Sequence, residues 1–254
     1  MIDVRAPQYR PRTYRRPDEE RPYQQRGTAN GGGPRNNPYY RDRRDQPPPR
    51  GFQKKNNFFK PEIKITNDMQ VTDGKHKGVQ LRSTESPKVR PTARRIRETL
   101  FKVLNRRVKF ARFLDLCAGC GAVGVEAISR GALLSTFVER SPKMCNFIKH
   151  NLDACQICPT GHGEIVNLEC LPFIKRMKAR KRCWDIIFFD PPYDANYDEV
   201  IELISRGACI KPQGGILVIE HPAEMFFPQT IGFLTRRKVV KEGDTALTFY
   251  ECWK

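Results

Sequence analysis

The sequence contains no apolar run near the roughly 20 residues that a membrane-spanning helix needs, which argues against an integral membrane protein. It also lacks the pattern of a secretory signal peptide, because its first thirty residues carry Arg and Pro in place of an apolar stretch. Asp18, Glu19 and Glu20 argue against a transit peptide, since transit peptides are poor in acids. Nine cysteines are an odd number, which favours a reducing compartment over a disulfide framework. We therefore expect a cytoplasmic protein without a membrane partner.

Acidic residues are scarce relative to basic ones. The 254-residue chain has 46 Lys and Arg against 28 Asp and Glu, so its formal net charge is +18 and its pI is about 9.7. This excess favours a polyanionic partner, nucleic acid first and an anionic membrane surface second. A chain of this length can bury roughly 70% of its unfolded surface, so its core needs no disulfide or metal.

Residues 1–60 have very few aliphatic side chains and many Arg, Pro, Tyr, Gly and Asn residues. Such a segment cannot bury enough apolar surface to offset chain entropy, so we expect a disordered tail. It carries fifteen Lys and Arg against six Asp and Glu. Disorder rich in Arg and Tyr can bind RNA by charge and stacking; a solubilising extension of no specific role is the alternative.

The next segment, residues 61–107, is predicted to be a basic β-hairpin and helix. Residues 62–83 alternate in polarity around a Thr-Asp-Gly turn, which predicts the hairpin. Ile96, Leu100 and Leu104 repeat at i, i+4 and i+8, which predicts a helix with one buried face. Arginines at a helix start oppose the helix macrodipole, so a bound anion would relieve the conflict; a solvated basic face is the alternative. The candidate RNA contacts are Lys75, Lys77, Arg90, Arg94, Arg95 and Arg97.

A strand predicted at residues 110–116 runs into a glycine-rich loop. Gly119, Gly121 and Gly124 follow the spacing G-x-G-x-x-G between this strand and a predicted helix, the context that makes the pattern informative. Glycine lets the backbone approach a ligand, and the helix N-terminus favours a negative group there. Glu139 ends the next predicted strand, twenty residues past the first glycine, where an acid can bind ribose hydroxyls. A solvated strand end is the alternative for Glu139 taken alone.

Strands and helices alternate through the rest of the chain, which predicts an α/β fold with a parallel sheet and right-handed crossovers. The predicted helices are residues 125–130, 141–153, 171–178 and 198–206. The predicted parallel strands that follow the glycine loop are 136–138, 165–168, 186–189 and 216–219. Two final runs, 233–240 and 246–253, predict an antiparallel pair at the sheet edge.

The apolar strand at 186–189 exits into Asp-Pro-Pro-Tyr, at the end of the strand where open α/β sheets bind ligands. The two prolines have no backbone N–H and fix φ, so they stiffen the turn and leave carbonyls free to accept hydrogen bonds. A carboxylate, free carbonyls and an aromatic face suit a planar base with an exocyclic amine. A Pro-rich strand exit with an incidental Asp and Tyr is the alternative. The candidate catalytic residues are Asp190, Pro191, Pro192 and Tyr193.

Four acids, Asp115, Glu139, Glu169 and Asp190, fall at the ends of four predicted strands. A glycine loop with a downstream acid can serve either NAD or S-adenosylmethionine. A row of acids repels a pyrophosphate but suits a sulfonium, an ammonium, a ribose diol and an adenine amine. Hydride transfer also has no use for the Asp-Pro-Pro-Tyr stretch. We therefore predict S-adenosylmethionine as the cofactor.

From about Met69 to its C-terminus the chain resembles the RsmD family of 16S rRNA guanine-N2 methyltransferases. The matching stretches are residues 90–92, 94–101, 115–122, 126–132, 190–193 and 243–247, and their order and spacing together are specific. The resemblance implies a seven-stranded, Rossmann-like class I methyltransferase sheet over residues 108–254, mostly parallel with the last strand antiparallel. It also implies S-adenosylmethionine as cofactor, 16S rRNA or the small ribosomal subunit as partner, and an RNA grip by the hairpin and helix. We expect a monomer.

The chain departs from the family pattern at four positions. Cys117 and Cys120 replace an aromatic residue and a serine, Ala93 replaces a common threonine, and Glu169 replaces a shorter Asp or Asn. The candidate cofactor residues are Asp115, Ala118, Gly119, Gly121, Glu139, Arg140, Glu169, Cys170 and Asp190.

In the expected reaction the guanine N2 displaces the methyl group in line from the sulfonium sulfur. Asp190 and the Pro191 carbonyl would accept the N–H bonds of N2, and Tyr193 would stack on the extruded base.

Two other functions remain open: a DNA adenine-N6 or cytosine-N4 methyltransferase, and a non-catalytic RNA-binding assembly factor. A zinc site formed by the Cys117/Cys120 and Cys155/Cys158 pairs is disfavoured, because a metal at the first pair would block the glycine loop, and we predict no metal.

Overall fold

The computed structural model describes residues 69–83, 94–158, 161–192 and 198–254. They belong to one compact unit, Phe58–Lys254. The predicted tail and the predicted roles of Arg90 and Tyr193 lie outside the described residues. Within the described residues, no helix is long and apolar enough to cross a membrane.

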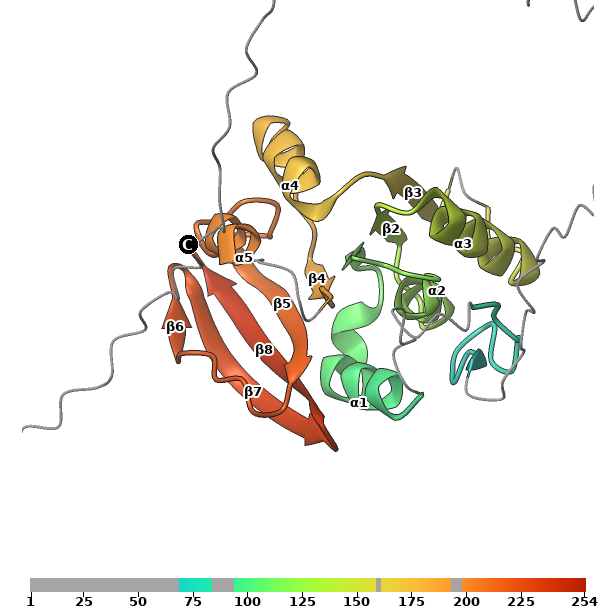
Figure 1. Ribbon diagram of the computed structural model, residues 1–254, viewed down its shortest axis with the longest axis horizontal. Coiled ribbons are helices and arrows are strands. Elements are labelled where there is room, and N and C mark those ends of the chain that lie inside the picture. The colour runs from blue at the N-terminus through green and yellow to red at the C-terminus, as the bar shows by residue number, and fades with distance from the viewer. Residues whose placement is uncertain (1–68, 84–93, 159–160, 193–197) are drawn as a thin grey trace, which may run out of the picture. The chain divides into compact units, whose positions relative to one another are not determined.

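An eight-stranded sheet organises the unit, in the order β3-β2-β1-β4-β5-β8-β7-β6 (Figure 1). The first five strands of that order are parallel, and β8, β7 and β6 each run antiparallel to the preceding strand. The strands are β1 (Arg112–Leu116), β2 (Leu134–Glu139), β3 (Gly163–Asn167), β4 (Ile186–Phe189), β5 (Gln213–Pro222), β6 (Thr230–Ile231), β7 (Leu234–Glu242) and β8 (Thr245–Trp253). The helices are α1 (Arg94–Leu104), the 3-10 helix η2 (Asn105–Val108), α2 (Ala122–Ser129), α3 (Pro142–Ala154), α4 (Cys170–Ala179) and α5 (Asp198–Ser205).

The mostly parallel α/β sheet and the terminal antiparallel pair are confirmed, but the predicted count of seven strands is wrong by one. The eighth strand is β6, only two residues long. It forms because Gly232 adopts φ +53° and turns the chain back, so that Ile231 pairs with Leu234. Two residues are too few to show the alternation by which a strand is recognised in a sequence.

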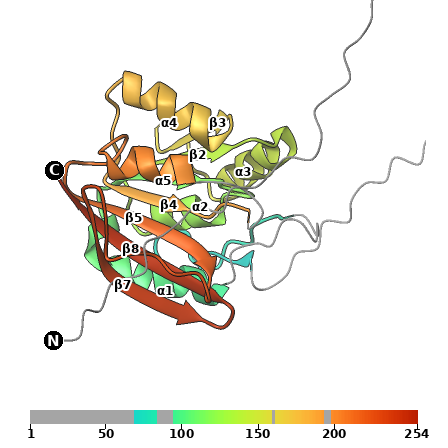
Figure 2. The ribbon, with the colours of Figure 1, turned by 60° about the vertical axis from the view of Figure 1, so that its left-hand side comes forward.

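Helices cover both faces of the parallel strands. Successive residues of a strand point to opposite faces, so β4 contributes Ile187 to one core and Phe188 to the other. The Ile187 face packs against α4 and α5, and the Phe188 face packs against α1 and α2. In Figure 2, α4 and α5 lie above the sheet and α1 lies below it. All four residues of β4 are buried, which explains why its sequence is a continuous apolar run.

Helices α1 and α3 form as predicted. Ile96, Leu100 and Leu104 make the buried stripe of α1. The predicted cap of α3 is also present, because the Ser141 side chain accepts from the Met144 backbone N–H and a proline occupies the first helical position.

Of the predicted hairpin, the described residues 69–83 form a short antiparallel pairing. The Val71 N–H donates to the Val79 carbonyl at 3.0 Å and the Leu81 N–H to the Met69 carbonyl at 2.8 Å. The turn lies against the end of α2, where a Cβ on Gly74 would come within 2.0 Å of the Ser129 carbonyl oxygen. Its apolar residues share a core with α2 and α3, so this basic segment and the sheet are packed as one structure.

Arg97, predicted to contact RNA, is a core residue in the structure. Its side chain is fully buried, its Nε lies 3.5 Å from a Glu126 carboxylate oxygen, and its guanidinium donates to the Gln70 carbonyl at 2.8 Å. Glu126 is also fully buried and accepts from Thr72 and Arg130. The prediction for Arg97 is therefore wrong, because an arginine on the inner face of α1 neutralises a buried carboxylate instead of facing solvent.

Candidate active site

The loop between β1 and α2 is built by glycines with two different tasks. Gly119 and Gly121 adopt φ +55° and +77°, the left-handed region, and Gly121 is the cap residue of α2. Gly124 is instead required for close packing, because a Cβ there would lie 2.2 Å from the Phe137 ring. This cap starts α2 at Ala122, three residues earlier than its apolar pattern predicted.

Strand register brings the key residues to one edge of the sheet. Leu116 of β1 pairs with Val138 of β2 on one side and with Phe189 of β4 on the other. The next residues along the three strands are Cys117, Glu139 and Asp190. Because the strands are parallel neighbours, these three residues lie side by side at one edge of the sheet. The glycine loop begins at the same edge.

Glu139 joins the glycine loop to the start of α3. One carboxylate oxygen accepts from the Gly119 N–H at 2.9 Å and the other from the Ser141 N–H at 2.8 Å. Its side chain is almost completely buried, yet a carboxylate has more lone pairs than these two bonds use. Glu139 thus fixes the loop and keeps acceptor capacity for a ligand hydroxyl.

Asp115 is the next-to-last residue of β1, at the end of the strand that precedes the glycine loop, as predicted. It is buried and accepts from the Gly124 N–H at 2.9 Å. Burial raises the pKa of Asp115 well above its ordinary value, and the charges of Asp190 and Glu139 raise it further, against the effect of the Gly124 bond. Three acids therefore repel one another at this edge, and a cationic ligand would relieve that repulsion.

Asp190 and its prolines follow β4 directly. The Asp190 N–H donates to the Leu116 carbonyl at 3.4 Å, which holds the strand exit against β1. Asp190 is partly exposed, Pro191 is buried and Pro192 is exposed. The exit of β4 thus places Asp190 beside the end of β1, where the glycine loop begins.

Two links between segments of the candidate site were not predicted from the sequence. The sulfur atoms of Cys117 and Cys170 lie 2.9 Å apart, which brings the loop after β1 to the first residue of α4. The Asn167 side chain donates to the carbonyls of Glu139 and Arg140, both at 2.9 Å, and so ties the ends of β2 and β3 together. Both links join segments that are distant in sequence, which is why local spacing could not reveal them.

The remaining predicted residues are more peripheral. Glu169 is the exposed residue before α4 and makes no side-chain cap bond, and the Arg140 side chain is exposed. Ala118 is held by its N–H to the Val138 carbonyl at 3.0 Å. The described candidate RNA contacts other than Arg97 are exposed: Lys75, Lys77, Arg94 and Arg95.

The residues at this edge fit S-adenosylmethionine. Glu139 and Asp190 would supply acceptors and negative charge to a ligand that carries a sulfonium, an ammonium and a ribose diol. At Gly119 a Cβ would meet no atom within 4 Å, so the loop is open on that side. Among the described residues, no group of three or more His, Cys, Asp and Glu could hold a metal ion.

Known structures share this architecture. A SAM-dependent methyltransferase from Agrobacterium tumefaciens superimposes with a TM-score of 0.53 at 15% identity, covering 68% of this chain and 67% of that one, which shows the fold alone. The solved structure of yhhF from Escherichia coli superimposes with a TM-score of 0.63 at 26% identity, covering 72% of this chain and 97% of that one. The fold and the acidic, glycine-lined edge define an S-adenosylmethionine-dependent methyltransferase.

The family follows from sequence comparison. The family model described as conserved hypothetical protein 95 matches residues 69–251. Two similar curated proteins, from Buchnera aphidicola and Haemophilus influenzae, are each named ribosomal RNA small subunit methyltransferase D. Each is 32% identical to this chain and covers 74% of it and 94% of its own length. The chain belongs to this family, the RsmD family, as the resemblance predicted.

Proposed function

We propose that the protein transfers a methyl group from S-adenosylmethionine to the exocyclic N2 of one guanine in 16S rRNA. The observation that carries the proposal is the register that sets Asp190 beside Cys117 and Glu139 at the edge where the glycine loop begins. The names of the similar proteins support ribosomal RNA of the small subunit as the substrate class.

Asp190 and Pro191 would position the amine. The guanine N2 is conjugated into its ring and is a poor nucleophile, so its orientation matters more than early removal of its proton. The Asp190 carboxylate and the Pro191 carbonyl would accept its two N–H bonds and direct its lone pair to the methyl group. Positioning of this kind can supply on the order of 7–11 kcal/mol. The bound cofactor would supply an electrophilic methyl group on sulfur.

The target base must leave its helix to reach this edge. Exposed lysines and arginines of residues 75–77 and of α1 would bind the surrounding phosphates, because phosphate contacts set orientation without reading sequence. The exit of β4 would then accept the extruded base.

The two alternatives, a DNA amine methyltransferase and a non-catalytic assembly factor, fit the described residues less well. A DNA amine methyltransferase would use the same acceptors, but the family match spans residues 69–251, and the described part of that span contains no additional domain to read DNA sequence. A non-catalytic assembly factor would have no need for three acids at the cofactor edge.

Labelled S-adenosylmethionine, offered with small subunits, naked 16S rRNA or duplex DNA, separates these functions. We expect label in rRNA and N2-methylguanosine on nucleoside mass spectrometry. Label in DNA would support the DNA methyltransferase, and RNA binding without transfer would support the assembly factor.

Asp190→Ala tests the assigned chemistry. Loss of an acceptor at the reacting amine should lower turnover about 10²- to 10³-fold, with cofactor affinity largely retained. Asp153→Ala is the matched control, because it removes an exposed acid at the far end of α3. Normal turnover in Asp190→Ala would refute the role of this carboxylate.

A further inference from the structure

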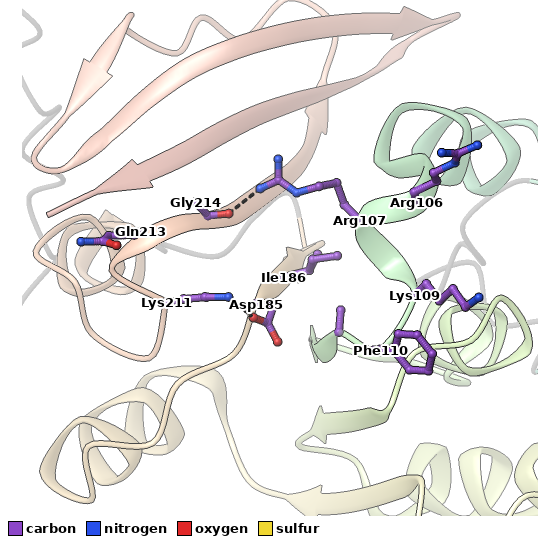
Figure 3. Close-up of a pocket in the computed structure, with 10 residues that line it drawn as sticks. Arg106, Arg107, Lys109, Phe110, Asp185, Ile186, Lys211, Gln213 and Gly214 are labelled. Atoms are coloured by element: carbon purple, nitrogen blue, oxygen red, sulfur yellow. Dashed lines mark hydrogen bonds and ion pairs between the residues drawn. The ribbon is translucent and has the colours of Figure 1, made fainter.

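A second feature lies at the other edge of the parallel sheet, where β1 and β4 begin. A cavity of about 350 Å³ opens there between η2, the start of β4 and the turn before β5 (Figure 3). Strands β1 and β4 rise about 3.3 Å per residue over four or five residues, so roughly 15 Å separates this cavity from the glycine loop. The active-site residues described above do not line it.

The lining of this cavity is basic. The residues that line it include the basic residues Arg106, Arg107, Lys109 and Lys211 and the acidic residue Asp185. Two of the cations have anionic partners: the Lys211 ammonium lies 3.1 Å from Asp185, and Arg107 lies 3.3 Å from Glu251.

The other two cations are uncompensated. Arg106 and Lys109 are exposed, and neither forms an ion pair with a residue in the described part of the chain. The walls around them are fixed, because Arg107 also donates to the Gly214 carbonyl at 2.6 Å, the bond dashed in Figure 3. The cavity therefore has a net positive charge and a wall fixed by this hydrogen bond, and both features favour the binding of an anion.

Phe110 adds a flat aromatic surface to the same site. It is 71% exposed and has φ +63°, a left-handed conformation that a bulky residue rarely adopts. The bond from its N–H to the Gly131 carbonyl, 2.8 Å long, holds this conformation. The Lys109 ammonium lies 5.2 Å from the ring centroid. Because of this conformation the strand predicted to start at residue 110 begins only at Arg112, and the aromatic ring lies in solvent beside the Lys109 ammonium.

We propose that this cavity binds a single-stranded segment of RNA, with one base stacked on Phe110 and the adjoining phosphates bound by Arg106 and Lys109. Exposed aromatics next to cations are the means by which proteins hold single strands without reading their sequence. The inference rests on the proposed function, because an RNA held here would be another part of the strand whose guanine reaches the opposite edge.

Binding of a fluorescent 12-nucleotide oligouridylate to the full chain tests the site. Uridine has no exocyclic amine, so it does not compete as a methyl acceptor. The double charge reversal Arg106→Glu/Lys109→Glu should weaken binding about tenfold or more and lower the salt slope by about 1.4, since each single-strand phosphate contact contributes about 0.7. The control Lys149→Glu/Lys178→Glu changes the net charge equally on exposed faces of α3 and α4 and should cost much less.

Substitutions at Phe110 test stacking separately from charge. Phe110→Leu keeps an apolar side chain on the same backbone and should weaken binding about tenfold, whereas Phe110→Tyr should bind as the wild type does.

Photocrosslinking of a 5-iodouridine oligomer should label the peptide that contains Phe110. Equal affinities of the wild type, the double variant and Phe110→Leu, or a crosslink elsewhere only, would overturn the proposal. Arg106→Gln/Lys109→Gln replaces the double reversal if circular dichroism shows that the reversal does not fold.

The outcome is separable from that of the proposed function. If the wild type methylates rRNA but the cavity variants bind the oligomer normally, only this inference fails. If the variants lose the oligomer while the wild type methylates no rRNA, the cavity stands as an RNA site and the proposed reaction fails.

Discussion

The Cys117 thiol lies close to two acids of the candidate active site, Asp190 and Glu139. Its hydrogen bond with Cys170 raises its pKa well above the ordinary value, and burial and the charges of Asp190 and Glu139 raise it further. A thiolate is the reactive form of cysteine, so this environment makes Cys117 unreactive at neutral pH. A cysteine in this loop thus behaves as a neutral side chain beside the cofactor edge.

Alkylation with iodoacetamide, followed by peptide mass spectrometry, measures this effect. Cys117 should react much more slowly than the exposed Cys158 at pH 7, and its rate should keep rising with pH because its pKa is raised. S-adenosylmethionine should slow it further if it occupies the edge described above. Equal rates for the two cysteines at pH 7 would show that the Cys117 environment is not as described.

At the scale of the elements, the buried carboxylate of Glu126 joins three segments. It accepts from Thr72 of the basic turn and from Arg130 after α2, and it faces Arg97 of α1. Arg130 also stacks on Phe101 of α1, with its guanidinium carbon 4.9 Å from the ring centroid. The network therefore fixes the exposed lysines of the turn relative to the exposed arginines of α1.

Glu126→Gln should lower the free energy of unfolding by about 3–5 kcal/mol, because Arg97 would keep a buried charge without its counterion. Denaturant titration measures the change. Glu98→Gln is the control, since Glu98 pairs with Arg94 on the exposed side of the same helix at 2.8 Å and should cost only about 0.3–0.5 kcal/mol. Similar losses in the two variants would show that burial does not strengthen the Glu126 network.

At the scale of the whole molecule, the chain carries a net charge of +18, yet one edge of its sheet is lined with acids. The exposed lysines and arginines would bind RNA, and the acids would bind the cofactor. Mobile salt screens the exposed charges much more than the buried carboxylates. RNA and cofactor should therefore respond differently to ionic strength.

Affinity for a 16S rRNA fragment should fall by about 50-fold between roughly 50 and 200 mM salt if four phosphates are contacted, with log affinity linear in log salt. Affinity for S-adenosylmethionine should change less than about threefold, because its predicted acidic partners Asp115 and Glu139 are buried. Fluorescence anisotropy and calorimetry give the two slopes. An RNA affinity independent of salt would contradict a phosphate-based grip.

The sequence by itself determined the order of the elements and the edge of the sheet at which the candidate site residues lie. The apolar run of β4, the stripe of α1, the Ser141 cap and the glycine loop are local patterns, and local patterns depend on backbone preferences and on periods of two or 3.6 residues. Because β1, β2 and β4 are parallel, a residue after each strand had to fall at one edge, and this much of the site could be predicted.

Only the tertiary structure decided which side chains meet. The helical period places Arg97 on the same face of α1 as Leu100 and Leu104, but only the structure shows the buried carboxylate of Glu126 that faces it. The closeness of Cys117 to Cys170 depends likewise on how segments 53 residues apart are packed. Phe110, two residues after η2, has a left-handed conformation that its residue type disfavours. Each of these outcomes depends on burial and on distant partners, which the sequence holds only through the completed fold.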